Sequence, residues 1–236
     1  MKITYWSDYA CPYCYIGEAR LEKAIEELAK ENVINKEDIE IEMKAFELDP
    51  NASYEVVSRT DERFAKKYGM TLDGARRQIE HISMLGRGEG IEFNYIDTQY
   101  TNMLDAHRLT KLVASKGGKE NTDKVIKLLF DAYFTKNLKL ADRTVLTDIA
   151  KQVGIEENEL NKMLASKDFI DDVRYDENEA YSLGVHGVPY FVIDDMYVIS
   201  GCDSISGMKH TIKKSLENSN GTSGQGMTCG SDGCHF

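Results

Sequence analysis

The sequence Cys11-Pro12-Tyr13-Cys14 lies between an extended segment, residues 3–6, and a helix-forming run that reaches Lys30. Two cysteines separated by two residues at a strand-to-helix turn have the spacing that disulfide exchange requires. A helix N-terminus stabilises a thiolate at the first cysteine, and Pro12 fits the first helical turn because that turn does not use its missing N–H. The pattern predicts redox chemistry, with a zinc knuckle or two packed core thiols as the alternatives.

Composition restricts the possible functions. The chain has 236 residues, 42% of them apolar, and a formal net charge of −11. Nucleic acids and anionic membranes are bound by clustered Lys and Arg, so we expect neither as a partner. No stretch reaches the roughly 18 apolar residues of a membrane span, and the N-terminus lacks a secretory signal pattern. Five cysteines are too few for a disulfide-built scaffold. We therefore expect a cytoplasmic protein, although a mature secreted chain with an added Met has the same pattern.

The two ends of the chain carry the strand signals. Apolar and polar side chains alternate along residues 2–6 and again along residues 39–46. A helical stretch at 12–30 separates these two segments. Two strands joined by a helix normally lie parallel, so these segments predict a β-α-β unit. Residues 190–194 and 196–200 are predicted to be strands of an antiparallel hairpin, because a tight connection separates them.

The region between these ends, residues 53–184, has the periodicity of helices. Its expected helices, and a last one after the hairpin, are 60–69, 72–86, 101–116, 120–135, 143–153, 156–166, 167–183 and 204–217. We interpret the Gly-rich run at 86–90 as a helix break, because it lacks the Gly-Lys-Ser/Thr ending of a phosphate loop. From residue 218 the composition becomes rich in Gly, Ser and Asn, which is typical of a flexible linker.

Four motifs, in order along the chain, resemble the DsbA family of the thioredoxin superfamily, and within it the FrnE-like branch. They are S-D-Y-A-C-P-Y-C at 7–14, F-E-L-D-P at 46–50, G-V-H-G-V-P-Y-F-V at 184–192 and S-G at 200–201. The resemblance implies an α/β protein, a thioredoxin fold with a large all-helical insertion between its β-α-β and β-β-α halves. The implied domains are a discontinuous thioredoxin-like domain at 1–52 and 185–217, the helical insertion at 53–184 and a Cys-containing tail at 218–236.

The resemblance also implies residues that bind substrate. In thioredoxin folds the proline that opens the third strand is cis and faces the CxxC, and Pro189 holds that position. The backbone of Val188 would then bind an extended substrate, together with Pro12 and Tyr13 between the cysteines. His186 is a candidate modulator of the thiolate, with an ordinary surface histidine as the alternative.

Disulfide exchange on this fold gives each cysteine a role. Cys11 would attack a substrate disulfide, and Cys14, shielded in the helix, would resolve the mixed disulfide. A buried acid often manages the resolving proton in this fold. Glu18 and Glu47 are the candidates here, although each is closer in pattern to a solvated surface residue.

Three more cysteines follow later in the chain. Cys229 and Cys234 lie on the linker-like tail. FrnE-like proteins carry a similar extension, so we expect a second dithiol that exchanges electrons with the CxxC pair. Metal binding with His235 and a bystander tail are the alternatives, and we expect no metal site because these donors lack a fourth ligand. Cys202 is interpreted as inert, a small buried residue at the start of the last helix.

The leading functional hypothesis is a dithiol–disulfide oxidoreductase that acts on protein or small thiol substrates. An upstream thiol reductant or oxidant would be its partner, and glutathione is a candidate co-substrate, with no other cofactor needed. The alternative on a related fold is a kappa-type glutathione transferase or a hydroxychromene-carboxylate isomerase, but those relatives place Ser where Cys11 stands. A third hypothesis is a redox sensor or holdase whose dithiols only switch binding.

Overall fold

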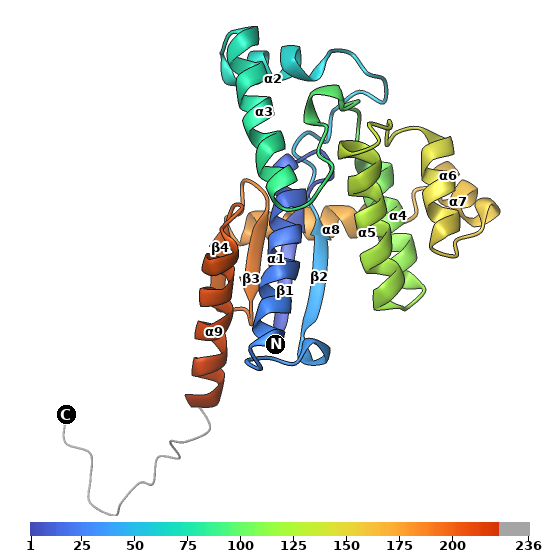
Figure 1. Ribbon diagram of the computed structural model, residues 1–236. Helices are drawn as coiled ribbons and strands as arrows, with labels where there is room; N and C mark the ends of the chain where they lie inside the picture. The colour runs from blue at the N-terminus through green and yellow to red at the C-terminus, as the bar shows by residue number, and fades with distance from the viewer. Residues whose placement is uncertain (222–236) are drawn as a thin grey trace, which may run out of the picture.

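Figure 1 shows a computed structural model of the chain, in which residues 1–221 are described. The N-terminal unit consists of β1 (Lys2–Ser7), α1 (Pro12–Lys30) and β2 (Glu40–Ala45). The helices that follow are α2 (Thr60–Tyr68), α3 (Leu72–Gly88), α4 (Leu104–Ser115), α5 (Lys119–Phe134), α6 (Arg143–Gln152), α7 (Glu157–Ala165) and α8 (Ile170–Ser182). The chain then forms β3 (Tyr190–Ile193), β4 (Tyr197–Ser200) and α9 (Ile205–Gly221). This is the predicted order of elements.

In the described part of the chain, four strands form one sheet in the order β2-β1-β3-β4. β1 lies parallel to β2 and antiparallel to β3, in a register that sets Tyr5 opposite Phe191. β3 and β4 pair as an antiparallel hairpin. Asp194 and Asp195 form its turn with φ of 48° and 55°, a left-handed conformation that aspartate tolerates better than most residues. Both predicted pairings are confirmed.

Alternation along β1 sends successive side chains to opposite faces of the sheet. Tyr5 stacks on Phe191 with ring centroids 5.4 Å apart, in the core under α1 and α9. Trp6 lies on the other face, where its Nε1–H donates to the carbonyl oxygen of Asp176 in α8 at 2.9 Å. As Figure 1 shows, α1 and α9 therefore cover one face of the sheet and α8 covers the other.

The helical region packs around an aromatic cluster that also holds the cysteine loop. Tyr15 of α1 stacks on Phe130 of α5 with ring centroids 4.9 Å apart. Cys11 and Cys14 belong to the same buried cluster. The N-terminal end of α1 thus lies where the sheet meets the helical block. The division of the chain into domains at the predicted boundaries stays a prediction.

Several element ends differ from the predicted ones for local reasons. α4 begins at Leu104 because the Asn102 side chain accepts a hydrogen bond from the Leu104 N–H at 2.9 Å. α8 begins at Ile170, since Phe169 adopts a left-handed φ of 63° that a helix cannot continue through. α9 extends to Gly221, so the last helix enters the stretch that was predicted to be linker. Two unpredicted 3-10 turns occupy Lys36–Asp38 and Tyr95–Asp97.

The predicted break at 86–90 is displaced to the C-terminal end of that run. α3 continues through Gly86 and ends at Gly88, and Gly90 turns the chain with a φ of 83°. Gly86 has a packing role, because a Cβ there would lie 2.6 Å from Cγ and 2.9 Å from Cβ of the buried Phe93. A Cβ on Gly88 would meet nothing within 4 Å.

We expect Gly86→Ala to lower the free energy of unfolding by about 1–3 kcal/mol, because the added methyl group overpacks against Phe93. Gly88→Ala in the same helix is the matched control and should be neutral or stabilising by less than about 1 kcal/mol. Urea denaturation of both variants measures the difference. Equal stability of the two variants would contradict the packing role of Gly86.

Candidate active site

Cys11 is the N-cap residue of α1, with an extended conformation at φ −90° and ψ 114°, and Pro12 begins the helix. The Cys11 N–H donates to the Asp8 carbonyl at 3.0 Å, and the Cys14 N–H donates to the Cys11 carbonyl at 3.1 Å. These bonds place Cys14 one turn into the helix. Both cysteines are free thiols. They are 4% and 1% exposed respectively, so the pair lies almost entirely inside the protein.

The environment of Cys14 keeps its thiol protonated. Burial raises the pKa of Cys14 well above its ordinary value, and hydrogen bonding to the Cys11 thiol raises it further. The backbone of Asp8 and the side chain of Ser7 oppose the rise without overcoming it. Since the thiolate is the attacking species, Cys14 is poorly suited to start an exchange.

The loop before β3 reaches the cysteines, as the resemblance implied. The Val188–Pro189 peptide bond is cis. The Cys11 thiol donates to the carbonyl oxygen of Val188 at 3.4 Å. On the helix side, a Cβ on Gly17 would lie 3.2 Å from Cγ of Pro189, so glycine at 17 lets α1 approach this loop closely.

A groove of about 790 Å³ opens over the cysteine loop. One wall contains Cys11, Pro12 and Tyr13 together with Val188, four of the residues predicted from the sequence. The opposite side comes from the helical block, and its aromatic members are Phe64, Tyr68, Tyr95 and Tyr100. The charged residues of the groove lining are Arg63, Lys66 and Lys67 from α2 and Asp49 from the segment after β2. We call this the thiol groove.

His186 and Pro189 lie outside the lining of the thiol groove. Both line a neighbouring surface hollow of about 330 Å³ instead. The His186 side chain is exposed, and its ring centroid lies 6.4 Å from that of Tyr181 in α8. The structure therefore does not bring His186 to the thiol of Cys11.

The carboxylate nearest in sequence to the CxxC, that of Asp8, was missed as a site residue. It is buried and accepts from the Ala10 N–H at 2.9 Å and from the Leu48 N–H at 2.7 Å. It therefore ties the end of β1 to the segment after β2. An aspartate that accepts from the N–H two residues later is a common turn device, and that local signal was present in the S-D motif.

A histidine from α4 lies beside Asp8. Nε2 of His107 is 3.8 Å from Oδ1 of Asp8, and both groups are buried. The imidazole ring lies against Tyr9 with centroids 4.8 Å apart. Neither ring nitrogen has a hydrogen-bond partner among residues 1–221. No local pattern in the sequence marks His107, because about 100 residues separate the two groups in the chain.

Both candidate acids are buried, which corrects the expectation of solvated surface residues. Burial raises the pKa of Glu18 to about 8, and the carboxylate of Glu22 adds to the rise. Burial also raises the pKa of Glu47, while His107 and then Arg174 oppose it. Arg174 donates to Glu47 at 2.5 Å. Glu18 lies a turn beyond Cys14 in α1, and neither acid forms a hydrogen bond to a cysteine in the described residues.

Cys202 lies in the loop before α9 rather than in the helix itself, and it is half-buried. Nη1 of Arg20 approaches its sulfur at 3.5 Å. Burial nevertheless raises the pKa of Cys202 to about 11, with Arg20 opposing. A thiol with that pKa stays protonated near neutral pH, which agrees with the interpretation of Cys202 as inert.

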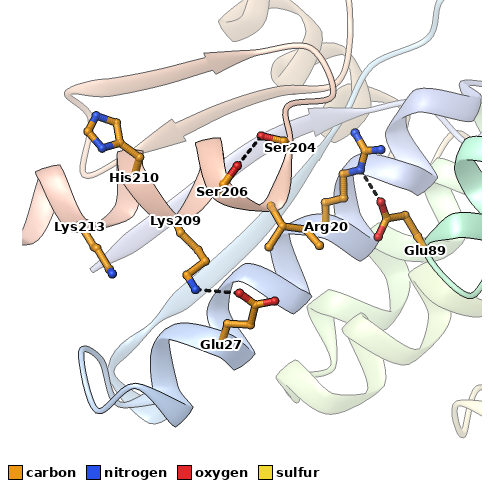
Figure 2. A pocket seen from close by; sticks show the side chains of 9 residues that line it. Arg20, Glu27, Glu89, Ser204, Ser206, Lys209, His210 and Lys213 are labelled. Atoms are coloured by element: carbon orange, nitrogen blue, oxygen red, sulfur yellow. Dashed lines mark hydrogen bonds and ion pairs between the residues drawn. The ribbon is translucent and has the colours of Figure 1, made fainter.

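A second large hollow, of about 610 Å³, lies between α1 and α9 and contains neither cysteine of the CxxC (Figure 2). Its positive side chains already have carboxylate partners. Arg20 donates to Glu89 at 2.7 Å, and Lys209 lies 2.7 Å from Glu27. These ion pairs connect the elements that line the hollow. Because the charges neutralise one another, the hollow offers little to a charged ligand.

The fold and site define a class of protein: a thioredoxin-fold protein with a dithiol at the start of α1, opposite a cis proline that opens β3. Residues 2–213 match the family model of the DSBA-like thioredoxin domain. The chain belongs to this family, and the predicted family and fold class are confirmed. The match does not separate out the FrnE-like branch, which stays a prediction.

Similar proteins span nearly the whole chain. The uncharacterized protein YwbO of Bacillus subtilis (strain 168) is 27% identical over 203 residues, or 84% of this chain and 89% of YwbO. A probable DsbA oxidoreductase from Streptomyces coelicolor has a crystal structure with a TM-score of 0.84 at 27% identity, covering 100% of this chain and 99% of that one. A 2-hydroxychromene-2-carboxylate isomerase structure has a TM-score of 0.67 at 14% identity, covering 95% and 100%. At that identity the likeness is one of fold alone.

One sequence prediction concerns residues beyond this description. Cys229 and Cys234 lie outside residues 1–221, so their pairing stays a prediction. Within residues 1–221, no group of three His, Cys, Asp or Glu side chains is arranged to hold a metal ion. Over the same residues, no helix combines the length and the apolar character that crossing a bilayer demands.

We expect Asp8→Ala to lower the free energy of unfolding by about 3 kcal/mol, because it leaves the N–H groups of Ala10 and Leu48 without their charged acceptor. Asp49→Ala is the control, since the exposed Asp49 accepts a single N–H bond, from Asn51 at 3.1 Å. That variant should lose less than about 1 kcal/mol. Chemical denaturation of both variants provides the measurement, and a small loss for Asp8→Ala would contradict its bracing role.

The buried Glu18 makes stability depend on pH. Its pKa is about 8 in the folded protein, above its ordinary value of 4.5, so the folded state binds the proton more tightly. The stability that this tighter proton binding contributes to the folded state is fully present below about pH 4.5 and is lost as the pH rises to about 8. Glu18→Gln should therefore be more stable than the parent at pH 9 and similar to it at pH 4. Urea denaturation at both values checks this, with the exposed Glu26→Gln as the control on the same helix. An equal effect of Glu18→Gln at both pH values would contradict it.

Proposed function

We propose that this protein is a dithiol–disulfide oxidoreductase in which Cys11 is the nucleophile and Cys14 is the resolving thiol. The asymmetry between the two cysteines carries the proposal. Cys11 lines the thiol groove and occupies the N-cap of α1, where the helix dipole favours a negative charge. Cys14 is 1% exposed, and its raised pKa suits a thiol that reacts second.

The exchange then follows in two steps. The thiolate of Cys11 attacks one sulfur of the substrate disulfide, the bond between the two substrate sulfurs breaks, and one substrate thiolate leaves. That thiolate accepts a proton, for which Cys14 is the nearest donor thiol. The thiolate of Cys14 next attacks the sulfur of Cys11, the mixed disulfide bond breaks, and the second substrate thiolate leaves and takes a proton from solvent. Two electrons have passed to the substrate, and an upstream thiol reductant restores the dithiol. The reverse sequence oxidises a substrate dithiol.

The loop before β3 would position an extended substrate beside Cys11. The Val188 backbone lies against the Cys11 sulfur, and a substrate segment that pairs with this loop would bring its own sulfur to the same place. Pro12 and Tyr13 form the adjoining part of the groove wall. This arrangement supports protein or small thiol substrates as the partners of the enzyme.

Three further parts of the proposal rest on the sequence. Glutathione is proposed as a co-substrate, since its thiol form would reduce the Cys11–Cys14 disulfide between turnovers and its disulfide form would oxidise the dithiol. A cytoplasmic location is proposed from the small number of cysteines, five in 236 residues. The tail pair Cys229 and Cys234 is proposed as a relay to the CxxC, because it lies on a linker-like stretch of sequence that resembles the extension of FrnE-like proteins.

The competing functions make different demands on Cys14. A glutathione transferase or an isomerase on this fold needs no second thiol, whereas the buried Cys14 sits one turn from Cys11 and against it. A redox sensor or holdase would use both thiols without turnover. The close pairing of the two cysteines therefore favours disulfide exchange over the transferase and isomerase alternative.

We expect Cys11→Ser to abolish turnover of bis(2-hydroxyethyl) disulfide, because the nucleophile is lost. Cys14→Ser should keep the first attack and accumulate a mixed disulfide at Cys11, since nothing resolves it. Cys202→Ser is the control and should keep full turnover. Alkylation followed by mass spectrometry locates the adduct. Turnover that survives in Cys11→Ser would refute the assignment, and isomerisation or glutathione conjugation by Cys14→Ser without disulfide exchange would select the alternative.

A further inference from the structure

The disulfide chemistry does not use Arg63, although this residue of α2 lines the thiol groove together with Cys11. The guanidinium carbon of Arg63 lies 3.9 Å from the centroid of the Tyr100 ring. Its Nε and Nη2 atoms are buried and have no hydrogen-bond partner among residues 1–221. Buried donors are nearly always paired, so two unpaired ones on a single side chain point to an acceptor that comes from outside the chain.

The acidic side chains around Arg63 are bonded to other groups. Asp61, the buried carboxylate of α2, accepts from Nε of Arg59 at 3.1 Å and from Nε of Arg76 at 2.8 Å. Asp49, the carboxylate that lines the groove, accepts from a backbone N–H and forms no ion pair with Arg63 in the described residues. The neighbouring arginines thus have a carboxylate and Arg63 does not.

The charge of Arg63 acts on the same part of the groove as the reactive thiol. Tyr95 interacts electrostatically with both Arg63 and Cys11. Burial is the largest cause of the raised pKa of Tyr95, the charge of Arg63 lowers that pKa, and Cys11 raises it. Lys66 and Lys67 add two more positive charges to the groove lining. In a chain with a net charge of −11, this local positive field would draw an anion toward Cys11.

We propose that Arg63 binds the carboxylate of a small anionic disulfide and so holds the disulfide against Cys11. Nε and Nη2 form the side of a guanidinium that pairs with a carboxylate through two parallel N–H···O bonds. Tyr100 holds the guanidinium plane by stacking against it. The groove, at about 790 Å³, has the size of small-molecule sites, which is about 300–1,000 Å³. This inference rests on the proposed function and names its substrate class.

The test uses the reduced, full-length protein and three disulfides with similar aliphatic frames. They are 3,3′-dithiodipropionate with two negative charges, bis(2-hydroxyethyl) disulfide with none and cystamine with two positive charges. Single-turnover oxidation of Cys11 and Cys14 is followed by alkylation and mass spectrometry. Each rate is divided by that of free dithiothreitol with the same disulfide, which removes differences in intrinsic reactivity. The dianion should react fastest on this scale.

Arg63→Met should slow the dianion about 10- to 100-fold, the effect of losing a charge-assisted pair, and should change the rate with the neutral disulfide less than about twofold. Arg63→Lys keeps the positive charge but lacks the planar guanidinium, so its rate with the dianion should lie between those of the parent protein and Arg63→Met. Arg77→Met, on the exposed surface of α3, is the matched control and should match the parent protein. Equal slowing of all three disulfides by Arg63→Met, or no preference for the dianion, would overturn the anchor.

A binding measurement separates this inference from the proposed function. Suberate has the chain length of 3,3′-dithiodipropionate but no disulfide, and 1,8-octanediol is its uncharged counterpart. Suberate should slow alkylation of Cys11 by iodoacetamide in the parent protein and not in Arg63→Met, whereas the diol should slow it in neither. If none of the three disulfides oxidises the dithiol, the proposed function fails, and protection by suberate still decides whether Arg63 binds a carboxylate. Equal protection of both proteins would refute the anchor.

Discussion

The contact between the first turns of α1 and the loop before β3 is the interaction on which the site depends. It joins Cys11 to the Val188 carbonyl across 177 residues of chain. The sheet order makes this possible, because β3 lies directly beside β1 and starts where β1 ends. Gly17 completes the approach, since its bare Cα leaves room for the ring of Pro189. The Cys11 thiol and the loop that we propose to bind substrate are therefore held together by the core of the sheet.

A layer of buried polar groups braces the cysteine loop from below. Asp8 accepts backbone N–H groups from its own loop and from the segment after β2, and His107 approaches it from α4. In a low-dielectric interior, such groups cost free energy unless they are paired. Apolar side chains would bury the CxxC loop equally well, but they would not fix its backbone. The hydrogen bonds of Asp8 do fix the backbone of this loop.

The distribution of charge separates structural ion pairs from the groove. Between α1 and α9, positive and negative side chains neutralise one another and bind two elements of the fold together (Figure 2). In the thiol groove, Arg63 keeps its buried donors unpaired and stacks on Tyr100 instead. A protein with a net charge of −11 thus keeps a positive region beside Cys11. This local arrangement is invisible in the overall composition.

The sequence by itself determined the order of strands and helices, the CxxC at the N-terminus of α1 and the proline that opens β3. These features rest on local spacing, on periodicity and on turn residues, which act between neighbours in the chain. It did not determine the burial of Glu18, the approach of His107 to Asp8, the position of His186 outside the groove or the place of Arg63 within it. The tertiary structure decided these, because burial and charge pairing depend on which distant segments pack together. His107 comes from α4 and Arg63 from α2, and both lie near the CxxC loop at the N-terminal end of α1. No local pattern in the sequence of either helix indicates that it packs near this loop.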